Sequence, residues 1–112
     1  MLVVADSSPL VALISISRID IIPAIFKDVL IPPEVAAELG HAKRVSVVQD
    51  FIAQPPTWLV VRAPGSITQI PLLHAGEIAA ISLAQEVRAD LVLIDELRGR
   101  KAATNLGLAI TG

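Results

Sequence analysis

Short apolar runs alternate along the chain with longer segments in which apolar residues recur every three or four positions. The apolar runs are rich in Val, Leu and Ile and predict buried strands at 2–5, 29–31, 58–61, 91–94 and 108–110. The segments with helical spacing predict helices at 9–16, 19–26, 33–39, 45–52, 75–87 and 98–106. Strands that alternate with helices imply parallel pairing through right-handed crossovers. We therefore expect an α/β fold, a three-layer α/β/α sandwich around a short parallel sheet of about four to five strands.

The last predicted strand lies at the end of the sequence, just before Thr111 and Gly112. A doubly wound sheet normally follows such a strand with a helix that covers one face, and no residues remain here to form it. We expect a single domain over 1–112, truncated at its C-terminus, with apolar surface exposed around 105–112. Because soluble monomers rarely expose a large apolar patch, this predicts a homodimer.

The composition narrows the class of protein. Of the 112 residues 54% are hydrophobic and 18% charged, and the mean hydropathy is +0.69, which excludes a disordered chain. Aromatic residues make up only 3%, as is typical of a β-branched core between parallel strands and helices. There is no cysteine, so neither a disulfide framework nor a thiolate metal site is possible. No apolar stretch is long enough to span a membrane and no secretory signal is evident, so we expect a cytoplasmic protein with no membrane partner.

Two carboxylates each follow a predicted strand. Asp6 comes directly after 2–5 and Asp95 directly after 91–94. In open α/β sheets ligands bind beyond the carboxyl ends of the strands, so two neighbouring strands would bring these carboxylates together. The alternative is that each Asp caps the helix that follows it.

Two glutamates on predicted helices are further candidates. Glu38 lies on helix 33–39, and Glu77 follows Gly76 at the start of helix 75–87. Glu38 could equally belong to a solvated helix face, and Glu77 could compensate the helix dipole, as we expect of Glu34. Gly76 would let the backbone pass close to another group.

Four carboxylates gathered without bases repel one another, and a divalent cation such as Mg²⁺ or Mn²⁺ resolves that repulsion. Such a site can activate water for phosphodiester cleavage, which is nuclease chemistry. The net charge of −2 means that nucleic acid must be held by a local patch. Arg98, Arg100 and Lys101 follow Asp95 closely and are candidate phosphate contacts, although a solvated helix face would look the same. Ser8 could bind a ligand or cap the helix that follows it.

The sequence lacks the motifs of several other classes of enzyme and binding protein. The sequence contains neither GxGxxG nor GxxxxGK[ST], which disfavours dinucleotide-binding and P-loop proteins. His41 and His74 lack the HxH or HExxH spacing of zinc ligands, and we expect them at the surface or at helix caps.

Four blocks in order resemble the PIN domain family. They are Val3-Val4-Ala5-Asp6-Ser7-Ser8-Pro9-Leu10, Ile31-Pro32-Pro33-Glu34-Val35-Ala36-Ala37-Glu38-Leu39, Gly76-Glu77-Ile78-Ala79-Ala80-Ile81, and Leu93-Ile94-Asp95-Glu96 followed by Arg100 and Ala102. The combination looks most like an uncharacterised prokaryotic PIN subfamily, predicted to bind nucleic acid and related to VapC-type toxins. The resemblance covers nearly the whole chain.

The resemblance implies a Mg²⁺- or Mn²⁺-dependent endoribonuclease. Its acidic set would be Asp6, Glu38, Glu77 and Asp95, with Asp6, Asp95 and Glu77 as metal ligands. It further implies RNA as substrate, a homodimer, and a small antitoxin protein as partner in a type II toxin–antitoxin pair. The sequence departs from many relatives at Glu77, where they carry Asp. Two alternatives stay open: a non-catalytic PIN-like module that binds RNA or protein, and another Mg²⁺-dependent phosphotransfer enzyme.

Overall fold

The five strands form one parallel sheet. The computed structural model describes residues 1–95 and 97–111, and among these all side chains except those of residues 97 and 98. Over these residues the sheet has the order β3-β2-β1-β4-β5, and every neighbouring pair is parallel. The strands are β1 (Leu2–Ala5), β2 (Asp28–Ile31), β3 (Leu59–Val61), β4 (Leu91–Leu93) and β5 (Ile110–Thr111). The predicted α/β class and parallel sheet are confirmed.

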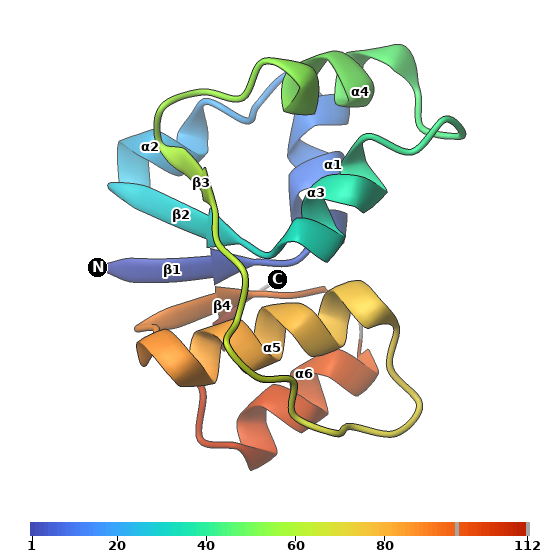
Figure 1. Cartoon of the computed structure of the whole chain (residues 1–112). Coiled ribbons are helices and arrows are strands. Elements are labelled where there is room, and N and C mark those ends of the chain that lie inside the picture. The colour runs from blue at the N-terminus through green and yellow to red at the C-terminus, as the bar shows by residue number, and fades with distance from the viewer. Residues whose placement is uncertain (96, 112) are drawn as a thin grey trace.

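Helices connect the strands and lie in two groups. They are α1 (Ser7–Ser15), α2 (Ile21–Ile25), α3 (Pro33–Leu39), α4 (Ser46–Ala53), α5 (Ala75–Val87) and α6 (Leu97–Asn105). Figure 1 shows α1 to α4 on the side of β2 and β3, with α5 and α6 beside β4. The chain first winds from β1 outward to β3 and then returns past β1 to β4 and β5. The two groups of helices meet where α3 contacts α5. The strand order reverses at β1, next to β4, which is where open sheets form a ligand-binding crevice.

The core surrounds the central strand. Val3, Val4 and Ala5 of β1 have no exposed surface, as expected for a parallel strand covered on both faces. Leu10 of α1 and Leu83 of α5 are also fully buried. Burial of an aliphatic side chain of this size stabilises the fold by about 1.5–3 kcal/mol. The apolar stripes read from the sequence therefore hold α1 and α5 against the sheet.

Two predicted boundaries were wrong. Helix α1 begins at Ser7 with Asp6 at the N-cap position, so Ser8 is not the N-cap residue. Strand β5 begins at Ile110 rather than at residue 108, because the backbone of Leu108 is still bonded to α6: its N–H donates to Ala103 O at 3.0 Å. Gly107, with φ of +79°, supplies the left-handed turn that follows α6.

An apolar groove lies between α1, α2 and the ends of β4 and β5. It has a volume of about 520 Å³ and is lined mainly by apolar side chains, among them Leu13, Ile22, Phe26 and Leu93. Of the segment 105–112, around which the sequence predicted exposed apolar surface, Thr111 lines this groove. Among the helices over 1–95 and 97–111, none is both long enough and apolar enough to cross a membrane.

Candidate functional site

A polar cavity lies beyond the carboxyl end of β1. Its volume is about 310 Å³. Its lining comes from the start of α1, the end of α3, the connection between α3 and α4, and the start of α5: Asp6, Ser7, Ser8, Glu38, Arg44, His74 and Glu77. Three of the four predicted acidic residues therefore line one cavity. These residues come from three separate elements, and they meet because α3 contacts both α1 and α5. We call this cavity the acidic cavity.

Asp6 is one of the buried carboxylates that line the acidic cavity. It is 4% exposed, and its backbone N–H donates to Leu93 O at 2.9 Å, which ties it to β4. Although Asp6 occupies the N-cap position of α1, its side chain makes no capping hydrogen bond. The capping alternative therefore does not account for this buried carboxylate. The positive end of the α1 dipole stabilises negative charge at this position.

The carboxylate of Glu38 accepts a hydrogen bond from a residue of α1. Ser7 Oγ donates to Glu38 Oε2 at 2.5 Å. Glu38 is half-buried rather than on a solvated face, because it adjoins the stripe of Val35 and Leu39 that packs into the core. Glu34, by contrast, lies in the first turn of α3, as expected for a residue that compensates the helix dipole.

One carboxylate oxygen of Glu77 accepts a hydrogen bond at the start of α5. Its Oε1 accepts the N–H of His74 at 3.0 Å, which satisfies a donor at the start of α5. The side chain is 4% exposed. Its other oxygen, Oε2, lies close to α6: a Cβ built on Gly99 would be 2.9 Å from it. To the dipole compensation that was the alternative for Glu77, the structure adds this hydrogen bond at the start of α5, and the carboxylate still lines the acidic cavity.

The missing side chain of Gly76 leaves space for the carboxylate of Glu38. A Cβ at Gly76 would lie 2.7 Å from Glu38 Cδ and 2.9 Å from Oε2. Real Cβ atoms do not approach other atoms so closely, so any larger residue would displace the carboxylate. The predicted close approach at Gly76 is confirmed, and the group that approaches is the candidate ligand Glu38.

Asp95 lies apart from the other three acidic residues. It is exposed and lines the apolar groove together with Leu93 and Thr111, not the acidic cavity. The register explains this, because Ala5 pairs with Leu93 and Asp6 is therefore level with Ile94. Side chains alternate between faces, so Asp95 follows Leu93 to the other side. The expectation that all four carboxylates lie together is met by three of them in this structure. Residue 96, which was part of the fourth block, lies outside the described residues.

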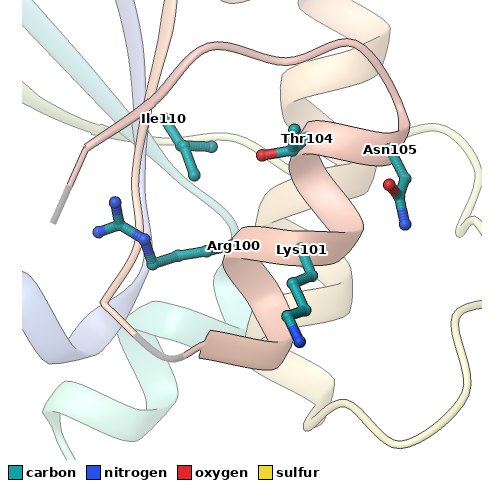
Figure 2. A pocket seen from close by; sticks show the side chains of 5 residues that line it. All are labelled: Arg100, Lys101, Thr104, Asn105 and Ile110. Atoms are coloured by element: carbon teal, nitrogen blue, oxygen red, sulfur yellow. The ribbon is translucent and has the colours of Figure 1, made fainter.

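The predicted phosphate contacts also separate. Ser8 is exposed and lines the acidic cavity. Arg100 and Lys101 line a different cavity, of about 340 Å³, with Thr104, Asn105 and Ile110. Figure 2 shows Arg100 and Lys101 extending in different directions from α6. The side chain of Arg98 lies outside the described part of the chain.

Sequence reasoning missed two contributors to the acidic cavity. Ser7 was passed over in favour of Ser8, although the first residue after a strand-end Asp is as well placed to reach inward. Arg44 gave no periodic signal, because it lies in the connection between α3 and α4, and only the folded chain brings it to the cavity. His74 is at the N-cap position of α5 and His41 is exposed, as predicted for histidines without metal-ligand spacing.

The donor set suits a hard divalent cation. Mg²⁺ and Mn²⁺ prefer carboxylate, hydroxyl and water oxygens, and Mg²⁺ keeps several waters, so few protein ligands are needed. Over the described residues, no group of three or more acidic or histidine side chains is arranged so that it could hold a metal ion by itself. The absence of a Cβ at Gly76 leaves the space in which the Glu38 carboxylate lies. The residues therefore fit a partly hydrated ion held by few carboxylates, and not a closed structural site.

A parallel sheet with three carboxylates at its switch point defines an α/β domain with an acidic site. The chain belongs to the PIN domain family: the family profile DUF3368, described as PIN domain, matches residues 2–112. Its structure is similar to that of a PilT N-terminus domain protein, SSO1118, from the hyperthermophilic archaeon Sulfolobus solfataricus P2. That match has a TM-score of 0.62 and 18% sequence identity, and it covers 99% of this chain and 86% of the other. At this identity the likeness shows the fold alone. No curated protein matches the sequence at a significant level.

Proposed function

We propose that this chain is a metal-dependent endoribonuclease of the PIN type. The observation that carries the proposal is the convergence of Asp6, Glu38 and Glu77 from three elements on one cavity at the switch point of the sheet. Two of these carboxylates are almost fully buried. Burial of several carboxylates side by side is unfavourable unless a cation compensates their charge, so such a set favours a metal site. PIN domains as a family are nucleases, which agrees with this chemistry.

Asp6, Glu77 and Glu38 are the residues that would hold Mg²⁺ or Mn²⁺. When bound, such an ion supplies activation of a water and stabilisation of the charge that develops on a phosphodiester. The protein's own groups orient the carboxylates: Ser7 Oγ holds Glu38, and the His74 N–H holds Glu77. Hydrogen bonds of this kind around ligands typically contribute about 10–100-fold in metal affinity or activity. Ser8, exposed at the same cavity, is placed to donate to a substrate oxygen.

The purified protein is expected to cleave single-stranded RNA in Mn²⁺ or Mg²⁺ and to lose that activity in EDTA. Oligonucleotide cleavage followed on denaturing gels measures it, with activity restored by excess Mn²⁺ as the control for chelation. Isothermal titration with Mn²⁺ in the absence of RNA separates the alternatives. Metal binding without cleavage would favour the non-catalytic binding module, and cleavage that survives EDTA would contradict the proposal. Activity toward a small phosphorylated substrate but not RNA would favour another Mg²⁺-dependent phosphotransfer enzyme.

A role as the toxin of a toxin–antitoxin pair, with a small antitoxin protein as partner, is part of the proposal. Its support is the resemblance of the four sequence blocks to a PIN subfamily that is related to VapC-type toxins. Growth arrest on induction of the chain, relieved by the product of a neighbouring small reading frame, would test it. Growth unaffected by an active nuclease would restrict the proposal to the enzyme.

We expect the chain to form a homodimer that covers the apolar groove beside β4 and β5. The groove exposes mainly apolar lining, and Ile25 at its edge is 68% exposed. Covering such surface is favourable by roughly 25 cal/mol per Å². Light scattering at micromolar concentration should give twice the chain mass, and Ile25→Glu should shift it toward the monomer. A wild-type monomer in this range would contradict the expectation.

A further inference from the structure

The connection between α3 and α4 carries basic side chains beside the acidic cavity. His41, Lys43 and Arg44, with Glu38, line a second cavity of about 230 Å³, which we call the basic cavity. Glu38 and Arg44 line both cavities, so the two adjoin. Figure 1 shows this connection on the side of the molecule toward which β1 points, the side of the strand ends. The cations therefore lie at the rim of the candidate metal site.

The connection is held in a defined shape. Gln49 Nε2 donates to three of its carbonyls, those of His41 at 3.1 Å, Ala42 at 3.2 Å and Arg44 at 2.8 Å. His41 Nδ1 accepts the N–H of Lys43 at 3.1 Å, so the neutral ring carries its proton on Nε2 and can donate there. A shape held before binding reduces the entropy lost when a ligand is bound.

Arg44 is anchored but keeps most of its donors. Its Nε donates to the backbone oxygen of Glu38 at 3.2 Å, which uses one of the five N–H groups of a guanidinium. Within the described part of the chain, neither Arg44 nor Lys43 forms an ion pair with a carboxylate. Their charge is thus not neutralised by a carboxylate in direct contact.

We propose that the basic cavity binds a phosphate of the RNA chain next to the bond that is cut. This inference rests on the proposed nuclease function and assigns the substrate contacts of that same site. Buried carboxylates repel a polyanion, so a nuclease with a net charge of −2 needs cations close to its acidic site. Arg44 and Lys43 supply charge there, and the fork of Arg44 matches phosphate oxygens. Arg100 and Lys101 line a cavity that shares no lining residue with the acidic cavity, so they are less well placed for this role.

The test compares single and double Gln substitutions. Lys43→Gln, Arg44→Gln and the double variant are measured against Lys27→Gln, an exposed lysine before β2 and so at the opposite edge of the sheet, and against Lys101→Gln. KM and kcat are determined with a fluorescent single-stranded RNA in Mn²⁺. Affinity for the same RNA is measured in EDTA by anisotropy as a function of salt, and circular dichroism establishes that each variant is folded.

Each single substitution is expected to raise KM and Kd about 3- to 10-fold, with a smaller change in kcat, as for loss of one charged contact. The slope of log affinity against log salt should fall by about 0.7 per phosphate contact removed. The Lys27→Gln control should bind and cleave as the wild type does, and Lys101→Gln should have a smaller effect than Lys43→Gln or Arg44→Gln. The proposal is overturned if the double variant matches Lys27→Gln in KM, Kd and salt slope, or if Lys101→Gln has the larger effect.

Cleavage in Mn²⁺ and RNA binding in EDTA together distinguish failure of the basic-cavity proposal from failure of the nuclease proposal. Cleavage by the wild type with no effect of Lys43→Gln or Arg44→Gln overturns the basic cavity and leaves the nuclease in place. RNA binding in EDTA that depends on these residues, without cleavage in Mn²⁺, supports the basic cavity and contradicts the nuclease. A wild type that neither binds nor cleaves RNA overturns both.

Discussion

Asp6→Asn is expected to reduce metal-dependent cleavage by more than about 100-fold while the fold remains intact. Asp6 is one of the two almost fully buried carboxylates of the acidic cavity, and its amide replacement keeps the size but removes the charge that would hold a cation. Loss of a ligand should exceed the roughly 10–100-fold effect of losing a group that only orients one. Cleavage rates in Mn²⁺ and a Mn²⁺ titration of both proteins measure the effect.

The melting temperature in EDTA distinguishes this role from a structural one. The Asp6 side chain makes no capping hydrogen bond, so its replacement removes no cap, and it relieves repulsion among the carboxylates. We therefore expect the metal-free variant to melt at the same temperature as the wild type or higher. A clear fall in melting temperature would assign Asp6 to the helix start instead.

Asp95→Asn is the matched comparison for Asp6→Asn. Asp95 is exposed in the apolar groove. Unchanged cleavage by this variant would restrict the site to Asp6, Glu38 and Glu77. A loss as large as that of Asp6→Asn would mean that the turn after β4 brings Asp95 into the acidic cavity when the metal and RNA bind.

Gly76→Ala is expected to reduce cleavage by about 10–100-fold with little change in stability. The added Cβ would occupy the space of the Glu38 carboxylate, whose Cδ lies 2.7 Å from that position. The displaced group is the end of a flexible side chain, so the fold can accommodate it, but Glu38 leaves its place and its bond from Ser7. Alanine also favours the helix over glycine by about 0.5–1 kcal/mol, which offsets the strain. Cleavage rate and melting temperature are the two measurements.

Two further variants make this prediction specific. Gly65→Ala creates a similar clash, with a Cβ 2.6 Å from Glu86 Oε1, but Glu86 lies outside the acidic cavity, so activity should be retained. Combining Gly76→Ala with Glu38→Asp shortens the acidic side chain by one methylene and should recover part of the lost activity. Full activity of a folded Gly76→Ala protein would show that the observed position of Glu38 is not needed.

The order and type of the elements follow from the sequence because they depend on local periodicity. The apolar run at 2–5 and the apolar stripe of 75–87 each match one buried face, and both elements appear where predicted. Asp6 and Glu77 could be selected in the same way, because a strand end and a first helical turn are positions defined by their neighbours in the chain. The predicted starts of α1 and of β5 were each two residues from the observed ones, because the end of α6 and the cap of α1 depend on which backbone groups find partners.

The tertiary structure determined which residues line the acidic cavity. Pairing of Ala5 with Leu93 sets the face toward which Asp95 lies, and that register is a property of two strands far apart in the sequence. The bond from Ser7 to Glu38 and the fit of Glu38 against Gly76 join α1, α3 and α5, which no local pattern relates. Arg44 reaches the same cavity from an irregular connection. The sequence by itself determined which acidic residues lie at the ends of strands and helices. Strand register and the packing of the helices determined which of those residues meet. The reason is that the proximity of two side chains depends on register and helix contacts rather than on their spacing along the chain.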